Sequence, residues 1–186
     1  MKGVVAHSVQ FHEEELTTVQ GIPVSCPART WCELGALLDV GSLVAAGDRI
    51  IHSTRGLITF DELGSAILSW RGSRGRVRLR EAYELLHDRS ESPQESMLRL
   101  VLVRAGLSGL SVNQPITTSS GHRFRAQYRH DLTRAIRLQA DGWTIVQIGA
   151  DDMRDPDQLL ARIRSILATA PSRHEVPEMD AKLGRW

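Results

Sequence analysis

Residues 91–106 read Glu-Ser-Pro-Gln-Glu-Ser-Met-Leu-Arg-Leu-Val-Leu-Val-Arg-Ala-Gly, and we expect the chain to change character at this stretch. Ser92 and Glu95 have the spacing of a capping box, and Pro93 suits the first helical position. The helix that follows, Met97 to Ala105, is apolar nearly all round, so we expect it to be buried on more than one side. The sequence before it favours helices, whereas strands and helices alternate after it.

Towards the amino terminus, residues 26–90 are typical of a helical region. Apolar residues recur at helical intervals, and Thr59 and Glu62 form a second capping box. Residues 1–25 alternate weakly between apolar and polar side chains. We expect two short strands there, around Gly3–Phe11 and Thr17–Pro23, and interpret the segment as the remnant of an upstream region.

Towards the carboxyl terminus, residues 91–170 combine the apolar helix with strands. Short strands are predicted at Ser111–Thr118 and at residues 123–125, and a basic helix follows them. Trp143–Ile148 carries apolar residues on both faces, as a central strand should. Asp155 is then expected to cap the last helix.

Composition indicates an ordinary globular protein with an uneven charge distribution. Of 186 residues, 41% are apolar and 24% charged, and the net charge is +1. No apolar run is long enough for a membrane span, so we expect a soluble, cytoplasmic protein with a flexible tail at residues 171–186. The 23 cations include only two lysines, and five arginines lie within residues 122–137 beside one aspartate. Arginine suits phosphate contacts, although a GC-rich genome also favours it.

Seven short segments recur in the same order in one group of proteins: Gly21–Trp31, Val44–Asp48, Glu91–Ser96, Leu100–Gly106, Asp131–Arg134, Asp141–Trp143 and Asp151–Asp152. In these segments the chain resembles the DUF559 family of actinobacteria, whose members are similar to very-short-patch-repair endonucleases. The resemblance covers most of residues 20–170. It implies a restriction-endonuclease-like, PD-(D/E)XK fold, in which carboxylates at one sheet edge hold Mg²⁺.

The acidic residues of that family site are largely absent from this sequence. Glu95 matches the family's helix acid, but residues 96–130 contain no Asp or Glu, and residues 3–181 contain no Lys. In the family, the Asp-bearing strand and the acidic strand lie between the segment that corresponds to 123–125 and the next helix. In this sequence, residues 126–131 follow directly and already match that helix. We therefore expect an internally deleted core without a resident cofactor, Mg²⁺ being expected in intact relatives. Whether the chain is an enzyme stays open.

Structural roles compete with each candidate ligand. Glu95 is either a remnant of the catalytic site or a helix cap, and capping is favoured because one carboxylate alone holds Mg²⁺ poorly. His130 and Asp131 are adjacent on a helix and point about 100° apart, so a shared metal is not expected. Asp151 and Asp152 suit a helix start. Cys26 and Cys32 lack partners at zinc spacing.

These observations predict an α/β (α+β) protein, with a helical region at 26–90 and a reduced endonuclease-like core at 91–170 that holds a small mixed sheet flanked by helices. The leading hypothesis is a degenerate, non-cleaving endonuclease that retains DNA binding. The alternatives are a protein-interaction module in a defence or toxin–antitoxin context, or a gene remnant. Phosphate contacts are expected from an arginine group at 71–80 and from a stripe made of Arg123, Arg125, Arg129, Arg134 and Arg137. An open sheet edge at Trp143–Ile148 predicts either a homodimer or a marginally soluble chain.

Overall fold

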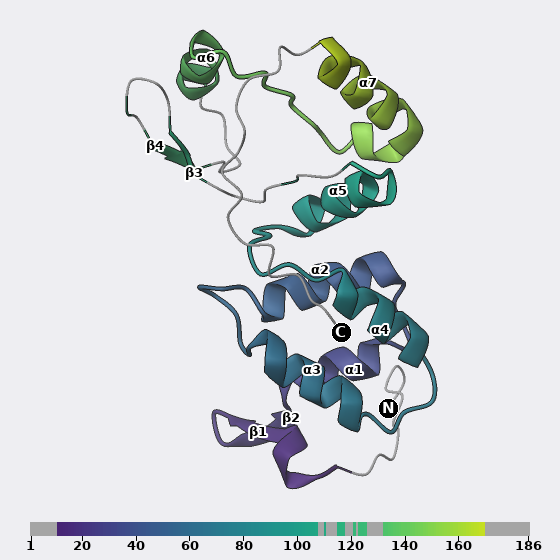
Figure 1. Ribbon diagram of the computed structural model, residues 1–186. Helices are drawn as coiled ribbons and strands as arrows, with labels where there is room; N and C mark the ends of the chain where they lie inside the picture. The colour runs from purple at the N-terminus through teal and green to yellow at the C-terminus, as the bar shows by residue number, and fades with distance from the viewer. Residues whose placement is uncertain are drawn as a thin grey trace, which may run out of the picture. The chain divides into compact units, whose positions relative to one another are not determined.

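The computed structural model describes residues 11–107, 110, 115–117, 121, 123–125 and 132–169 (Figure 1). The chain divides into two compact units, Met1–Arg129 and His130–Trp186, and each is described by itself. Helices predominate and short strands accompany them, which confirms the α+β class. No helix in the described ranges is long and apolar enough to cross a membrane.

The first unit begins with a β-hairpin. A 3-10 turn (η1, Glu13–Glu15) leads into β1 (Leu16–Val19), which pairs antiparallel with β2 (Ile22–Ser25). Gln20 and Gly21 between them have φ of 52° and 80°, as a tight two-residue hairpin turn requires. The single strand predicted over Thr17–Pro23 is therefore wrong, because this turn folds the segment back on itself. Of the other predicted strand, Gly3–Phe11, only Phe11 lies within the described residues, and it is irregular.

Five helices follow: α1 (Pro27–Leu34), α2 (Val40–Ile50), α3 (Phe60–Ser69), α4 (Arg76–Glu84) and α5 (Pro93–Arg104). Four begin at a residue whose side chain accepts a backbone N–H, and the predicted capping box of Thr59 and Glu62 is confirmed. Helix α4 instead begins at Gly75, where φ is +80° and a Cβ would lie 2.1 Å from the carbonyl oxygen of Gly35. Only glycine fits there, so the start of α4 lies directly against the α1–α2 turn.

The core of this unit lies around α2, which packs against α1, α4 and α5. Its buried apolar residues are Ala28, Trp31, Cys32, Leu43, Val44, Ile51, Leu63, Leu79, Ala82, Leu86 and Leu100. Inside it, Nε1 of Trp31 donates to the carbonyl oxygen of Leu43 at 2.9 Å. Leu100 places α5 in this helical core, whereas the sequence predicts a boundary between residues 90 and 91. The observed division follows Arg129 instead.

Two further strands lie in the first unit. Strand β3 (Pro115–Thr117) pairs antiparallel with β4 (Arg123–Arg125), within the two segments for which the sequence predicts strands. Both sheets among the described residues are two-stranded and antiparallel, so the mixed sheet expected from the resemblance is not what forms there.

The second unit contains α6 (Leu132–Ala140), a 3-10 turn (η2, Asp152–Arg154) and α7 (Pro156–Thr169). The side chain of Asp155 accepts from the backbone N–H of Gln158 at 3.0 Å, which confirms the predicted cap. The strand predicted at Trp143–Ile148 is wrong: residues 143–149 have no regular structure. A strand needs a hydrogen-bonding neighbour, and the described residues supply none for this segment. The open edge behind the homodimer hypothesis is thus not observed, and homodimerisation itself stays a prediction.

Candidate functional site

Glu95, the candidate remnant of the catalytic site, occupies the first turn of α5. The hydroxyl of Ser92 accepts from the backbone N–H of Glu95 at 3.2 Å, and a carboxylate oxygen of Glu95 accepts from the backbone N–H of Glu91 at 3.1 Å. The predicted capping box would place this second bond on the N–H of Ser92, so the observed bond reaches one residue further back. The geometry is that of a carboxylate that stabilises a helix start.

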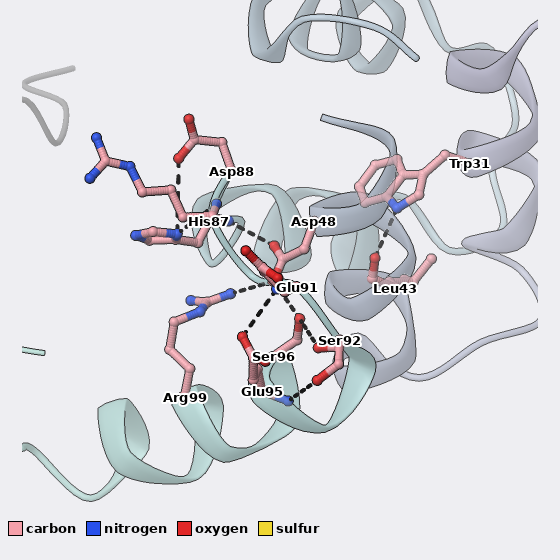
Figure 2. Close-up of polar contacts among 11 residues, drawn as sticks. Trp31, Leu43, Asp48, His87, Asp88, Glu91, Ser92, Glu95, Ser96 and Arg99 are labelled. Atoms are coloured by element: carbon pink, nitrogen blue, oxygen red, sulfur yellow. Dashed lines mark hydrogen bonds and ion pairs between the residues drawn. The ribbon is translucent and has the colours of Figure 1, made fainter. Parts of the chain in front are cut away.

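A buried carboxylate that the sequence analysis missed lies close to this helix start. Asp48 on α2 is only 1% exposed, and Figure 2 shows three groups that converge on it. One oxygen accepts from the backbone N–H of His87 at 2.7 Å. The other accepts from the Ser96 hydroxyl at 2.6 Å and from the Arg99 guanidinium at 2.9 Å. We call Asp48, His87, Ser96 and Arg99 the Asp48 cluster.

The Asp48 cluster joins three parts of the first unit. It connects α2 to α5 and to the loop between α4 and α5, and the Arg99 side chain is only 10% exposed. A buried ion pair with further hydrogen bonds fixes the relative placement of its elements, because each charge would be costly without the other. Burial and the nearby positive charge of Arg99 lower the pKa of His87, so its imidazole is neutral near pH 7. The cluster is therefore a structural tie.

A second polar link joins the loop after α2 to the loop before α5. The backbone N–H of Ser53 donates to the carbonyl oxygen of Asp88 at 2.9 Å, and Arg55 pairs with Glu91 at 3.4 Å. This link, like the Asp48 cluster, includes a carboxylate, that of Glu91. Among the described residues, however, no three Asp, Glu, His or Cys side chains are grouped so as to hold a metal ion.

The acidic pair in the second unit also serves local structure. One carboxylate oxygen of Asp152 accepts from the backbone N–H of Gly149 at 2.7 Å, and the other pairs with Arg162 at 2.8 Å. These contacts lower the pKa of the Asp152 carboxyl. Asp151 pairs with Arg154 at 3.0 Å. His130 and Asp131, the other candidate pair, lie outside the described residues.

The most unusual surface is basic and surrounds the start of α4. Its five arginines are Arg71, Arg74, Arg76, Arg78 and Arg80, which we call the arginine cluster, and residues 63–80 contain no Asp or Glu. Arg78 donates to the carbonyl oxygen of Leu38 at 2.7 Å. The other four are exposed, and their side chains make no ion pair or hydrogen bond within the described part of the chain. Exposed, unpaired guanidinium groups at this density are suited to phosphate oxygens.

The second basic group, predicted from the sequence, is divided between the two units. Arg123 and Arg125 lie on β4 in the first unit, whereas Arg134 and Arg137 lie on α6 in the second. Arg137 is exposed, and Arg129 lies outside the described residues. The stripe formed by these five residues therefore stays a prediction, and the arginine cluster is the better-defined candidate.

Relatives of this chain include two proteins of Mycobacterium tuberculosis. They are Uncharacterized protein MT2308 of strain CDC 1551 / Oshkosh and Uncharacterized protein Rv2248 of strain ATCC 25618 / H37Rv. Each is 32% identical to this chain over 172 residues, which cover 80% of this chain and 63% of the relative. The chain thus spans less than two thirds of the length of the curated relatives it matches.

The aligned length of 172 positions exceeds the part of this chain that the alignment covers. Eighty per cent of the 186 residues is about 149, so about 23 of the 172 aligned positions have no counterpart in this chain. Comparison with known protein families finds no match. Comparison with solved structures also finds no significant match.

Proposed function

We propose that this chain is a degenerate endonuclease-like protein of the DUF559, very-short-patch-repair type, which binds DNA in the cytoplasm without cleaving it. The arginine cluster is the observation that carries the proposal. Four of its members are exposed without a partner in the described structure, and no acidic residue interrupts residues 63–80. Phosphate contacts of this kind supply most of the affinity in non-specific DNA binding.

Two observations support the degenerate part of the proposal. Glu95 is engaged as a helix cap, and the chain has no Asp or Glu between residues 96 and 130 from which a second and third ligand could come. The alignment with the mycobacterial relatives also leaves about 23 positions without a counterpart, which agrees with an internal deletion. A metal-dependent nuclease needs several carboxylates around one ion.

Binding of a labelled, arbitrary DNA duplex at increasing salt tests the proposal. Each phosphate contact that a cation makes on duplex DNA adds about 0.9 to the slope of log affinity against log salt. Changing Arg71, Arg74, Arg76 and Arg80 together to Gln should therefore weaken binding and reduce the slope by about 2 to 4 units, according to how many of the four side chains contact phosphates. The four side chains are exposed, so the variant should keep its circular dichroism spectrum and melting behaviour.

A matched control removes the same charge elsewhere. Arg49, Arg55, Arg104 and Arg154 each donate to a carbonyl oxygen or pair with a carboxylate in the described structure. Their joint change to Gln lowers the net charge equally and should reduce the slope much less. If both variants reduce it equally, binding depends on overall charge and the arginine cluster is not the interface. If the unmodified chain does not bind DNA in low salt, the proposal is wrong.

A further inference from the structure

We propose that the exposed face at the start of α4 lies in the major groove of duplex DNA, where Arg76, Val77 and Arg80 contact base edges. This inference rests on the proposed DNA binding and goes beyond it, because phosphate contacts alone carry no sequence information. It assigns different roles within the arginine cluster: Arg76 and Arg80 would contact bases, whereas Arg71 and Arg74 would contact phosphates.

Helix α4 is held firmly from the side opposite to this face. Leu79 and Ala82 are fully buried in the core, and Arg78 donates to the carbonyl oxygen of Leu38. The close approach of Gly75 to Gly35 fixes the point at which the helix begins. The helix start is therefore placed by packing before any DNA is bound, which reduces the entropy lost on binding.

The outward face of α4 has the side chains that base recognition requires. Arg76 and Arg80 are four residues apart, so they lie on the same side of the helix, and both are exposed without a partner in the described structure. Guanidinium groups bind the O6 and N7 atoms of guanine through two hydrogen bonds in the major groove. Val77 beside them is 79% exposed, and an aliphatic side chain in this position can contact the methyl group of thymine.

The arrangement along α4 also suits entry into the groove by its first turn. In helices that bind the major groove, residues of the amino-terminal part reach the bases while flanking segments contact the backbone. Here the exposed arginines lie before α4 and in its first five residues, whereas the acidic residues Glu81 and Glu84 lie in its last four. Glu81 pairs with Arg104 of α5 at 3.6 Å. The acidic groups would thus lie at the end of the helix that is further from the bases.

Duplex DNA fits this face better than a single strand does. Proteins that bind single strands stack successive bases on exposed aromatic rings. Residues 71–80 contain no aromatic side chain. The nearest ring in sequence, Trp70, is half-buried and packs against the guanidinium of Arg29 at 4.7 Å. The surface therefore offers guanidinium groups and one aliphatic group, without a stacking platform.

Selection from a randomised duplex pool, followed by footprinting with dimethyl sulfate, tests the inference with the full chain. Dimethyl sulfate methylates guanine N7 in the major groove and adenine N3 in the minor groove. We expect enrichment of a guanine-containing site whose N7 atoms are protected. R76Q and R80Q should each abolish protection at one position and weaken binding to the selected site by roughly five-fold to one-hundred-fold. V77A should change the preference for thymine without changing the salt slope.

The paired variant R71Q/R74Q is the control. It should weaken binding to every sequence equally and reduce the salt slope by about 2, while guanine protection stays in place. Salt-dependent binding without any enriched sequence, protection of adenine N3 instead of guanine N7, or tighter binding to single strands would overturn the groove assignment but leave the proposed function standing. Binding to phosphatidylglycerol vesicles with no binding to duplex DNA would overturn both.

Discussion

Replacing Asp48 by Ala should be among the most destabilising single changes in the helical unit. The substitution removes the acceptor of three hydrogen bonds, from the His87 backbone, the Ser96 hydroxyl and the Arg99 guanidinium. It also leaves Arg99 with a side chain that is only 10% exposed and no opposite charge beside it. The lost contacts join α2 to α5, so the expected damage is a loosening of α5 from the core.

The expected loss in the free energy of unfolding follows from the burial of both Asp48 and Arg99. Removing one member of a buried ion pair costs about 3–5 kcal/mol, whereas a typical domain is stable by about 5–15 kcal/mol. Asp48→Ala should therefore remove about a fifth or more of the free energy of unfolding. Asp48→Asn should cost less, because its side-chain oxygen can still accept from the backbone N–H of His87. Replacing both partners, as Asp48→Leu with Arg99→Met, should restore much of the loss, since apolar residues of similar volume need no counter-charge.

Urea unfolding followed by circular dichroism measures these differences. With a slope of about 1–3 kcal/mol per M, typical of small proteins, a loss of about 3–5 kcal/mol lowers the urea midpoint by about 1 M or more. The double variant Asp48→Ala with Arg99→Ala should cost less than the sum of the single variants by more than about 1 kcal/mol. A cost below about 1 kcal/mol for Asp48→Ala, or additive single effects, would show that the Asp48 cluster is not a stabilising tie between α2 and α5.

Three further predictions follow from individual side chains. Burial and Arg99 lower the pKa of His87, so the unfolded chain takes up a proton near pH 6.5 that the folded chain does not. Stability should be full above that pH and fall as the pH drops through it, and His87→Gln should flatten this fall in urea titrations. Burial raises the pKa of Cys32 to about 12. A disulfide reagent at about pH 8 should therefore label Cys26 and leave Cys32 unmodified in the folded chain, which mass spectrometry can check. Rapid labelling of Cys32 would contradict the observed burial. Neither Mg²⁺ nor Mn²⁺ should support plasmid nicking, and metal-dependent nicking that disappears in Glu95→Ala would count against the non-cleaving assignment.

Local signals in the sequence predicted the helices well. The capping box of Thr59 and Glu62 fixed the start of α3, and Ser92 with Pro93 fixed the start of α5, because capping involves residues only three positions apart. The strand at Trp143–Ile148 failed for the opposite reason. Its apolar pattern indicates only that the segment is suited to a sheet. A strand also needs a neighbouring strand to pair with, and the local pattern does not show whether the fold supplies one.

The Asp48 cluster could not have been predicted from sequence spacing. Asp48 is separated by 39, 48 and 51 residues from the three groups that donate to it. The only local signal was a charged residue directly after the apolar segment Val44–Gly47, and it was not recognised. The arginine cluster was visible in the sequence. Two properties distinguish it from a set of ordinary surface ion pairs: the exposure of four of its side chains and their lack of partners in the described structure. Both properties can be read only from the folded chain.

Under the proposed function, the packing of α5 would let the chain lose catalytic strands and still keep a folded surface for DNA. The largest cluster of buried apolar residues runs from Ala28 to Leu100, and Asp48 ties α5 into it through Ser96 and Arg99. None of these contacts uses a residue beyond α5. The start of α4, which carries the arginine cluster, is fixed by Gly35, Leu38 and Leu79 of the same helical unit. A deletion after α5 would therefore remove the carboxylates needed for cleavage while leaving α4 and its outward face supported by the same core.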